Sequence, residues 1–262
     1  MSKLKLPGRI WIASDIHLGP HSPSTAAAFH DFLKAAANQA DALLLAGDIF
    51  DAWIGDDVIH RPEPWLKASL QVLRQTAACI PLWLGRGNRD FLIGDTLLRH
   101  LGARALPEPA LLETDAGAVL LAHGDEYCTA DAGYLRFRRI VRNPLVQRSY
   151  LALPLRTRQA IASWARQRSM QSNQYKSADI MDVESGAVID ALRAANTPWL
   201  IHGHTHRPAR HTHTVDGQQR ERVVLPDWDF DHTDTPRGGW VVIDSKGVHL
   251  IVHGPHGFLS AS

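Results

Sequence analysis

Short apolar runs recur along the chain, and each of them ends in a polar cluster. They include "RIWIASDIH", "ADALLLAGD", "IPLWLGRGNRD", "AVLLAHGDE", "TPWLIHGHTH" and "RVVLPDWD". Runs of about four to six apolar residues bounded by turn signals are typical of buried strands. Residues 25–39 and 65–78, which lie between such runs, have the apolar spacing of helices. This alternation predicts an α/β core.

Polar residues of a few chemical kinds follow these predicted strands. They are Asp15, His17, Asp48, Asn88, His123, His202, His204 and His206. Each motif alone is weak, because a single histidine after an apolar run is more often a hydrogen-bonded core residue than a ligand. The order D-x-H, GD, GN, H and GHxH nevertheless repeats one chemistry at successive strand ends, where ligands bind in open α/β sheets. The sequence therefore predicts one shared site.

Composition limits the class of protein. Of the 262 residues, 45% are apolar and 21% are charged, which fits one globular domain with room for an inserted subdomain. Cys79 and Cys128 form no CxxC pair, which argues against a disulfide framework or a thiolate zinc site and favours a reducing cytoplasm. We expect neither a secretory signal nor a membrane span, because no stretch approaches the roughly 18 apolar residues that a span needs.

Charge is distributed unevenly, although the formal net charge is only +1. Residues 133–178 contain no Asp or Glu but ten Lys or Arg, which leaves 18 basic against 27 acidic residues elsewhere. Pro144 and Pro154 stand where helices can start, and the mixture of apolar and basic positions around them is typical of amphipathic helices. We therefore predict a core formed by residues 1–132 and 179–262, with a basic helical insert at 133–178.

The kinds of side chain at the strand ends indicate the class of metal. Carboxylates, imidazoles and an amide oxygen without thiolates suit Mn, Fe or Zn and argue against a structural zinc site. One carboxylate can bridge two ions about 3.5 to 4 Å apart, and such a pair activates water while it clamps the oxygens of a phosphoryl group. We expect two divalent ions and the cleavage of a phosphoester bond.

The motifs also resemble those of a known family. The order "SDIH", "GDIF", "GNRD", "HGD" and "GHTH" is similar to that of the calcineurin-like metallophosphoesterases, which implies a four-layer αββα sandwich with a dinuclear centre. The longer stretches "GDIFDAWIGDD", "GNRDFLIG", "HGDEYCTADAGYLRFR", "IMDV" and "LIHGHTHRP" resemble the UDP-2,3-diacylglucosamine hydrolases. This narrower resemblance covers nearly the whole chain, insert included.

The resemblance implies a reaction and a place in the cell. A metal-bound hydroxide would attack the α-phosphorus of UDP-2,3-diacylglucosamine, giving UMP and 2,3-diacylglucosamine 1-phosphate in lipid A biosynthesis. The enzyme would be cytoplasmic and peripheral on the cytoplasmic face of the inner membrane, and it would hold two divalent ions, which we expect to be Mn²⁺. The expected partners are the nucleotide-linked glycolipid and the membrane surface. No nucleic acid and no obligate protein partner are expected.

The resemblance also assigns the ligands by motif. Metal one would be held by Asp15, His17, Asp48 and His206, and metal two by Asp48, Asn88, His123 and His204. His202 stands one position early for the GHxH pattern, so we interpret it as a strand-end residue that supports the ligands. Spacing alone does not choose between the histidine pairs. The catalytic residues would be Asp48, Asn88, Arg89 and His123.

Arg89 stands where the wider superfamily has a histidine that can protonate a leaving group. The change makes chemical sense, because a departing phosphate monoester needs neutralisation by a guanidinium more than it needs a proton. The alternative is that Arg89 only pairs with Asp90 or Asp51 at the surface. Two other features depart from the family's pattern: Arg86 precedes Gly87, and the segment "DWDFDHTDTPRGGW" is longer and more acidic than expected.

The resemblance implies that the insert at 133–178 forms a substrate cap. The stretch "RSMQSNQYKSADIMDV" resembles the substrate-binding segment of the family. The implied substrate-binding residues are Asn88, Arg89, Asp131, Ser169, Asn173, Lys176 and His204. A basic amphipathic stretch is otherwise most often a solvated helix face. Apolar residues such as Leu145 and Trp164 would either line an acyl-chain groove or pack the cap onto the core.

Rival functions remain open at this point. A nuclease or nucleotide phosphodiesterase of the same fold would use the basic insert and its aromatic residues to follow a strand. A binding scaffold that had lost catalysis should lack some ligands, whereas every ligand position is filled here. A membrane-surface module is compatible with the enzyme, because a lipid-linked substrate must be extracted from a bilayer.

Overall fold

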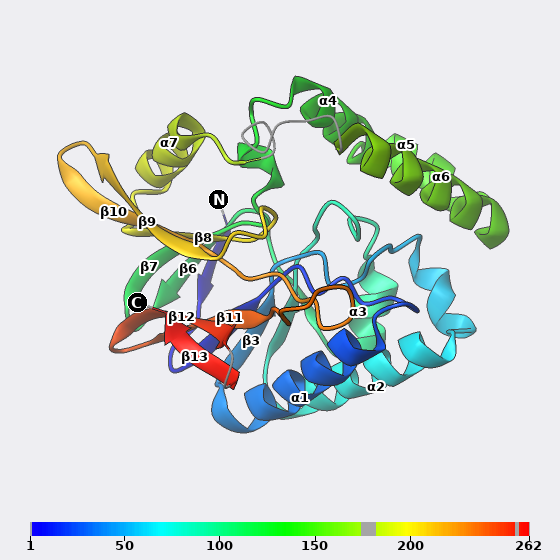
Figure 1. Cartoon of the computed structure of the whole chain (residues 1–262), viewed down its shortest axis with the longest axis horizontal. Helices are drawn as coiled ribbons and strands as arrows, with labels where there is room; N and C mark the ends of the chain where they lie inside the picture. Colours follow the sequence, from blue (N-terminus) through cyan, green and yellow to red (C-terminus); the bar gives the residue numbers. More distant parts are fainter. Residues whose placement is uncertain (1, 174–181, 255–256, 262) are drawn as a thin grey trace.

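Strands of the computed structural model, which describes residues 2–173, 182–254 and 257–261, form two mixed sheets (Figure 1). One sheet has six strands in the order β1-β6-β7-β8-β10-β9, and the other has seven in the order β13-β12-β11-β2-β3-β4-β5. The six are β1 (Ser2–Lys5), β6 (Ala110–Thr114), β7 (Gly117–Leu121), β8 (Trp199–His202), β9 (Ala209–Val215) and β10 (Gln218–Val224). The seven are β2 (Ile10–Ala13), β3 (Ala42–Leu45), β4 (Leu82–Leu84), β5 (Arg104–Ala105), β11 (Gly239–Asp244), β12 (Gly247–Gly254) and β13 (Gly257–Ala261).

Alternate residues of the central strands point to different layers. In β2, Ile10 and Ile12 pack between the two sheets, whereas Trp11 packs under the outer helices. In β8, Ile201 faces the other sheet and Leu200 faces outward. A strand has a side-chain period of two, so a strand that is covered on both faces needs apolar residues at every position. This requirement explains the continuous apolar runs in the sequence.

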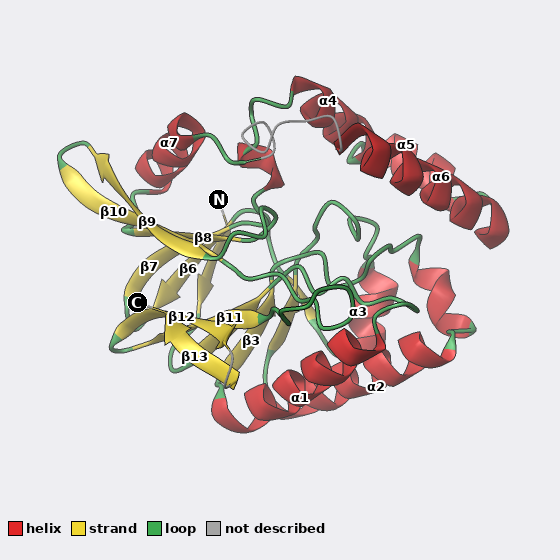
Figure 2. Cartoon of the chain, in the orientation of Figure 1, coloured by secondary structure: helices red, strands yellow, loops and turns green. Residues whose placement is uncertain are grey.

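Helices cover the outer face of each sheet (Figure 2). The seven-stranded sheet is covered by α1 (Pro23–Gln39), α2 (Pro64–Cys79) and α3 (Asp95–Leu101), and the six-stranded sheet by α7 (Ser185–Ala195). Both predicted helices are confirmed, and each starts a little earlier, at Pro23 or Pro64, because proline is favoured in a first helical turn. Helix, sheet, sheet and helix make the expected four-layer sandwich.

Three helices of the basic insert stand above the two sheets in Figure 1, and we refer to them as the cap. They are α4 (Ala132–Val141), α5 (Pro144–Leu151) and α6 (Leu155–Asn173), and short 3₁₀ segments lie at η1 (Asp56–His60) and η2 (Asp125–Tyr127). Asp131 caps α4 by accepting a hydrogen bond from the amide of Tyr134 at 2.9 Å. Pro144 starts α5 as predicted, and Pro154 directly precedes α6. The division into a core and a cap at residues 133 and 178 remains a prediction.

Arginines of the cap pair with carboxylates of the core. The pairs are Arg138 with Asp125, Arg142 with Glu108, Arg158 with Asp57 and Arg166 with Asp51. Four basic residues of the cap are therefore engaged in ion pairs that hold the cap above the acidic core. No helix in the described ranges is both long enough and apolar enough to cross a membrane.

Candidate metal centre

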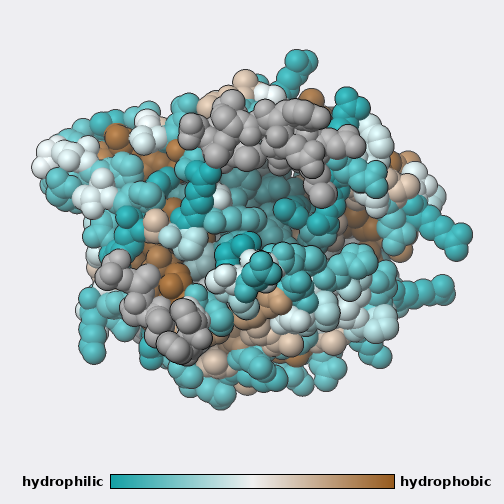
Figure 3. All heavy atoms as spheres, viewed as in Figure 1, coloured by the Kyte–Doolittle hydropathy of each residue, from teal (hydrophilic) through white to brown (hydrophobic). Residues whose placement is uncertain are grey.

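The predicted ligands stand in loops that follow strands of both sheets. They are Asp15 and His17 after β2, Asp48 after β3, Asn88 after β4, His123 after β7, and His204 and His206 after β8. The two sheets present these carboxyl ends at the same edge of the sandwich, as expected from the sequence. Figure 3 shows a recess with a hydrophilic floor between the cap and the core.

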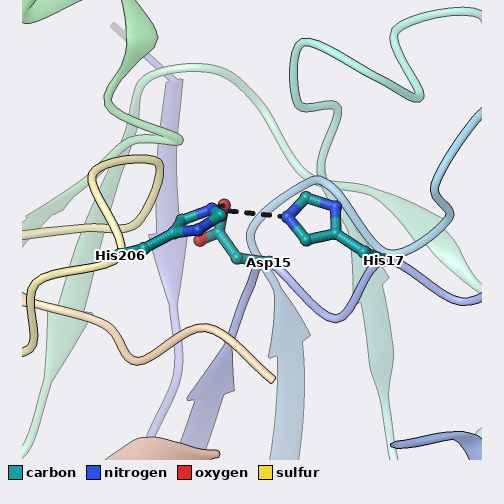
Figure 4. Close-up of side chains that lie close together, drawn as sticks. All are labelled: Asp15, His17 and His206. Atoms are coloured by element: carbon teal, nitrogen blue, oxygen red, sulfur yellow. Dashed lines mark hydrogen bonds and ion pairs between the residues drawn. The ribbon is translucent and has the colours of Figure 1, made fainter. Parts of the chain in front are cut away.

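One group of side chains joins the loop after β2 to the loop after β8 (Figure 4). Nε2 of His206 lies 3.3 Å from Oδ1 of Asp15 and 3.3 Å from Nε2 of His17. Two ligand atoms that are each about 2.1 Å from one ion lie roughly 3 to 4 Å apart. Oδ1 of Asp15 and Nδ1 of His17 are buried and have no hydrogen-bond partner within the described ranges. Because an imidazole binds a given ion through one nitrogen only, His17 can offer either Nε2 or Nδ1, and the spacing together with the spare Oδ1 of Asp15 fits a shared cation.

Asp48 lies between this group and a second one. Its Oδ2 is 3.9 Å from Nδ1 of His17 and 3.8 Å from Nε2 of His123. These distances are too long for hydrogen bonds but have the length of two ligands on one ion. Its Oδ1 accepts a hydrogen bond of 2.8 Å from the amide of Arg89, which fixes the carboxylate. Asp48 is thus placed as a bridging carboxylate would be.

The second group is centred on the side-chain oxygen of Asn88. Oδ1 of Asn88 lies 3.2 Å from Nε2 of His123 and 3.0 Å from Nδ1 of His204. The other ring nitrogen of His123 faces the carbonyl oxygen of Ala46 at 3.1 Å, which orients the ring toward the group. The structure thus brings together all seven residues of the predicted ligand set, on two sides of Asp48.

Backbone strain is concentrated in the same loops. Seven non-glycine residues of the described chain have positive φ, and five of them belong to the predicted ligand set. These five are Asp15, His17, Asp48, His204 and His206, with φ between 52° and 69°. The left-handed region is uncommon for residues with a Cβ, and such strain persists where the surrounding structure holds it for function. The strain therefore marks these loops as a functional site independently of the side chains.

Glycines before two of the ligands allow the loops to approach one another. A Cβ at Gly87 would overlap the carboxylate of Asp48, and a Cβ at Gly203 would overlap the side chains of Asp15 and Ser14. Any larger residue would therefore push the loops apart. This is the physical reason for glycine in the GN and GHxH motifs.

Burial and neighbouring carboxylates together set the charge state of the site. Burial opposes the charged forms of His123 and His206, but Asp48 beside His123 and Asp15 beside His206 outweigh it and raise both pKa values, that of His123 to about 10, so a cation would have to displace a proton from these two imidazoles. Burial dominates at the other two histidines. It lowers the pKa of His204 to about 4, and together with the charge of Arg89 it lowers the pKa of His17 well below its usual value. Both imidazoles are therefore neutral near pH 7 and able to bind a cation. Burial also raises the pKa of Asp48, against the opposing charge of His123. A cation beside Asp48 would favour the ionised carboxylate, so the electrostatics also fit a metal site.

Comparison with known proteins decides the family. The model of the family described as calcineurin-like phosphoesterase matches residues 8–208, which is more than half of the chain. The chain belongs to this family. The predicted family and the predicted fold class are both confirmed.

Three similar proteins carry the name UDP-2,3-diacylglucosamine hydrolase. The protein of that name from Bordetella parapertussis is 60% identical over 248 residues, which cover 95% of this chain and 96% of the relative. The one from Serratia proteamaculans is 44% identical and covers 91% of this chain and 96% of the relative. The one from Proteus mirabilis is 43% identical with the same coverage of both chains. The narrower resemblance predicted from the motifs is therefore confirmed.

Arg89 of the phosphoesterase lies at the edge of the metal centre. Its Nε is 3.8 Å from Oδ2 of Asp48, and its Nη1 donates a hydrogen bond of 2.8 Å to Oδ1 of Asp51. Arg89 thus pairs with Asp51, as in the alternative prediction, and it also lies at the edge of the metal centre. Arg166 of the cap shares the Asp51 carboxylate.

The structure separates His202 from the other two histidines of its motif. His202 is the last residue of β8, is fully buried and places its Nδ1 2.8 Å from the carbonyl oxygen of Gly203. Burial lowers its pKa to about 3. Arg86, the unexpected residue before Gly87, is exposed.

Two buried carboxylates near the ligands were missed by the sequence analysis. Asp90 accepts hydrogen bonds from the amides of Gly87, Asp48 and Ile49 at 2.7 to 3.1 Å, so it ties the GD loop to the GN loop. Asp227 lies 3.6 Å from Nδ1 of His206. Two features of the sequence could have pointed to them: Asp90 ends the motif "GNRD", and Asp227 begins the acidic segment that had no explanation.

That acidic segment folds over the centre. The amide of Trp228 donates to the carbonyl oxygen of Asp15 at 3.0 Å, and Asp231 accepts hydrogen bonds from the amides of Ser24 and Thr25 at the start of α1. A carboxylate at a helix N-terminus is favoured by the unpaired amides there. The acidic segment that begins at Asp227 therefore holds the loop that carries Asp15 in place.

The cap supplies a further residue that the sequence analysis missed. The ring of Tyr134 stacks on that of His204, with centroids 6.1 Å apart. Its hydroxyl donates a hydrogen bond of 2.6 Å to Asp125, which also binds Arg138 at 2.7 Å. The motif "HGDEYCTADAGYLRFR" contained these residues, but nothing in it indicated that they meet.

The predicted substrate-binding residues of the cap are only partly placed. Asp131 lies at the start of α4, at the edge of the core. Ser169 and Asn173 belong to α6, but their side chains lie outside the described part of the structure. Lys176 lies outside the described residues altogether. Their roles remain predictions.

Proposed function

We propose that this phosphoesterase hydrolyses the pyrophosphate bond of UDP-2,3-diacylglucosamine, giving UMP and 2,3-diacylglucosamine 1-phosphate. The observation that carries this proposal is the 60% identity, over 95% of the chain, to a protein named for that activity. The complete ligand set in one site supports it, because a relative that had lost catalysis need not keep every ligand. The nuclease alternative is not favoured, since each relative compared above is named for the glycolipid.

The proposed centre takes two divalent cations. Asp15, His17, Asp48 and His206 would hold one, and Asp48, Asn88, His123 and His204 would hold the other. Two bound ions supply positive charge that neutralises phosphoryl oxygens and promotes the ionisation of water. We favour Mn²⁺ because oxygen and imidazole ligands without thiolate suit it.

The roles of the surrounding residues follow from the bond that breaks. We place the α-phosphorus at the centre, so that the leaving group is the acylated sugar phosphate. Arg89, 34% exposed at the edge of the site, is positioned to neutralise that phosphate. No histidine follows Asn88, so the chain offers no acid there for a sugar alkoxide. Asn88 and His204 would contact the reacting phosphate, and Asp131, Ser169, Asn173 and Lys176 the glucosamine phosphate.

The activity is tested with purified protein, UDP-2,3-diacylglucosamine and ¹⁸O-labelled water. We expect the label in UMP, and no turnover after chelation until Mn²⁺ is restored. Label in the sugar phosphate would contradict attack at the α-phosphorus while leaving the activity intact. Failure to hydrolyse the glycolipid with Mn²⁺ present, together with cleavage of single-stranded DNA, would replace this function by the nuclease.

The cap supports a second part of the proposal, association with the cytoplasmic face of the inner membrane. Eight of the nine large apolar residues that are exposed in the described chain lie between Phe137 and Trp164, and Leu145 is 74% exposed. Apolar side chains beside an excess of arginine suit an anionic lipid surface.

Vesicle flotation tests this association. We expect the protein to float with vesicles that contain phosphatidylglycerol, and Leu145→Ser with Trp164→Ser to remain behind at unchanged thermal stability. The control is Phe258→Ser, because Phe258 is exposed but lies on β13 in the core. Equal flotation of all three proteins would contradict the role of the cap.

A further inference from the structure

The loop that carries Asn88 has a backbone partner in the cap as well as one in the core. The amide of Gly87 donates a hydrogen bond of 2.7 Å to the carboxylate of Asp90. The carbonyl oxygen of Gly87 accepts one of 3.0 Å from Nη2 of Arg142, and the carbonyl oxygen of Arg86 lies 3.4 Å from the same nitrogen. Arg142 therefore holds the peptide group that joins Gly87 to Asn88.

Arg142 belongs to the basic insert and directly follows the last residue of α4. Its Nη1 donates a hydrogen bond of 2.8 Å to Oε2 of Glu108, and its guanidinium carbon lies 5.9 Å from the centre of the Phe91 ring. A guanidinium carries several N–H donors in one rigid plane, so it can bind a carboxylate and a carbonyl oxygen at the same time. With 20% of its side chain exposed, Arg142 is largely enclosed by these partners.

The residue that Arg142 holds has little stiffness of its own. Glycine is required at position 87, because a Cβ there would overlap the carboxylate of Asp48. Glycine also has more backbone freedom than any other residue, so its conformation must be fixed by its partners. Hydrogen bonds to both the amide and the carbonyl group of Gly87 provide that restraint. Loss of one of them would let the next residue, Asn88, move.

Asn88 tolerates little movement as a metal ligand. Its Oδ1 lies 3.2 Å from Nε2 of His123 and 3.0 Å from Nδ1 of His204, the two imidazoles of the second group. The distance between a metal ion and each of its ligands is defined to within about 0.2 Å. A small shift of the peptide before Asn88 would therefore move the amide oxygen out of the range in which it can share an ion with both rings.

We infer that Arg142 is a positioning residue of the metal centre, which acts through the backbone of Gly87 to hold Asn88 in place as a ligand. The inference rests on the proposed two-cation centre and not on the proposed substrate. Arg158 offers a comparison, because it also ties the cap to the core, through the carboxylate of Asp57 in η1. Asp57 adjoins no predicted ligand in the sequence. Loosening the cap at Arg158 should therefore leave the metal centre intact, whereas the loss of Arg142 should not.

Calorimetric titration of the metal-free protein with Mn²⁺ tests this inference. We expect Arg142→Met to weaken the binding of one of the two ions by about 10- to 100-fold, the usual effect of removing a group that orients a ligand, and to leave the other ion unchanged. Arg139→Met, which replaces an exposed arginine of the same helix, is the matched control and should bind both ions as wild type does. Arg158→Met should do so too, although its cap is held less firmly.

A double substitution separates a role through Asn88 from a general loosening of the fold. In an Asn88→Ala protein, Arg142→Met should not weaken the affected ion any further, because the ligand that it positions is gone. Three results would overturn the inference: wild-type affinity for both ions in Arg142→Met, an equal further loss in the Asn88→Ala background, or the same loss in Arg158→Met.

Arg142→Lys is a second variant in case Arg142→Met does not fold. Lysine keeps the positive charge but lacks the planar fork, so it should weaken the same ion, and wild-type affinity in this variant would also contradict the role of Arg142. A wild-type protein that binds fewer than two ions would refute the proposed centre instead. The response of the remaining ion to Arg142→Met would then still decide the role of Arg142.

Discussion

The loops of the metal centre and the helices of the cap are held in place by different forces. The loops are fixed from within: Asp90 alone accepts four backbone hydrogen bonds from the GD and GN loops, and five ligand residues hold a strained backbone. The cap is fixed from outside, by four arginines that reach down to carboxylates of the core. Its own apolar side chains, such as Leu145 and Trp164, remain exposed.

We interpret this difference as a division of roles, in which the loops carry the chemistry and the cap takes part in substrate recognition. Strained, buried loops keep their geometry only because many contacts determine it, and such a geometry suits the placement of metal ions and a reacting phosphate. The ion pairs that hold the cap are few, and each has at least one partly exposed partner. They therefore stabilise the cap less than the buried contacts stabilise the loops, since an exposed ion pair contributes little. We therefore expect changes in the loops to abolish the reaction, and changes at the cap contacts, apart from Arg142, to alter stability and substrate handling.

The largest effect is expected at the residue shared by the two metal groups. Asp48→Ala should lower activity by at least about 10³-fold, because it removes the carboxylate that joins both groups. Metal analysis should show loss of bound ions. Asp31→Ala removes a surface carboxylate that is 77% exposed and should change neither quantity. An Asp48→Ala protein with two ions and near-normal turnover would show that the bridge is misplaced.

The histidine triplet allows a sharper test within one loop. His206→Ala should lower metal content and reduce activity roughly 10²-fold or more, since His206 faces Asp15. His202→Ala should keep its ions and measurable activity, but it should lose stability because it empties a fully buried site. Metal content and thermal unfolding distinguish the two effects. The reverse pattern of metal loss would move the ligand assignment to His202.

The same contrast explains how much the sequence could predict. Asp15, Asp48 and Asn88 were predictable because strand ends meet at one edge of a sheet and because each ligand stands in a short motif. Asp90 and Asp227 were not, since their roles depend on loops that meet only in the fold. The α/β core followed from the apolar runs, and its four layers followed from the resemblance to the family. The cap's contacts did not, because a basic amphipathic stretch predicts helices without saying which carboxylates they meet.

A moderate effect is expected at the contact between Arg158 of α6 and Asp57 of η1, which we call the clasp. Arg158 is 2% exposed and donates to the carbonyl oxygens of Leu153 and Ile54 and to the carboxylate of Asp57. Arg158→Ala should destabilise the cap by about 2 kcal/mol, because buried acceptors lose their partner. Hydrogen exchange in α5 and α6 should accelerate while that of β2 and β3 stays slow. Arg156→Ala, at an exposed position of α6, is the control, and acceleration in both regions would contradict a separable cap.

The smallest effect is the pH dependence of that clasp. The hydrogen bond from Arg158 lowers the pKa of Asp57 below its usual 3.8, and burial opposes this only in part. A carboxyl group with a lowered pKa in the folded state adds stability that is complete above the unfolded pKa and is lost as pH falls through the folded one. The difference in Tm between wild type and Asp57→Asn should therefore be constant from about pH 7 to 5 and shrink below about pH 4. The difference should be small throughout, because the side chain of Asp57 is 48% exposed and its charge is screened by solvent. Asp31→Asn, on the surface of α1, serves as the matched control, and a Tm difference for Asp57→Asn that vanished near pH 6 would mean that another group controls the clasp.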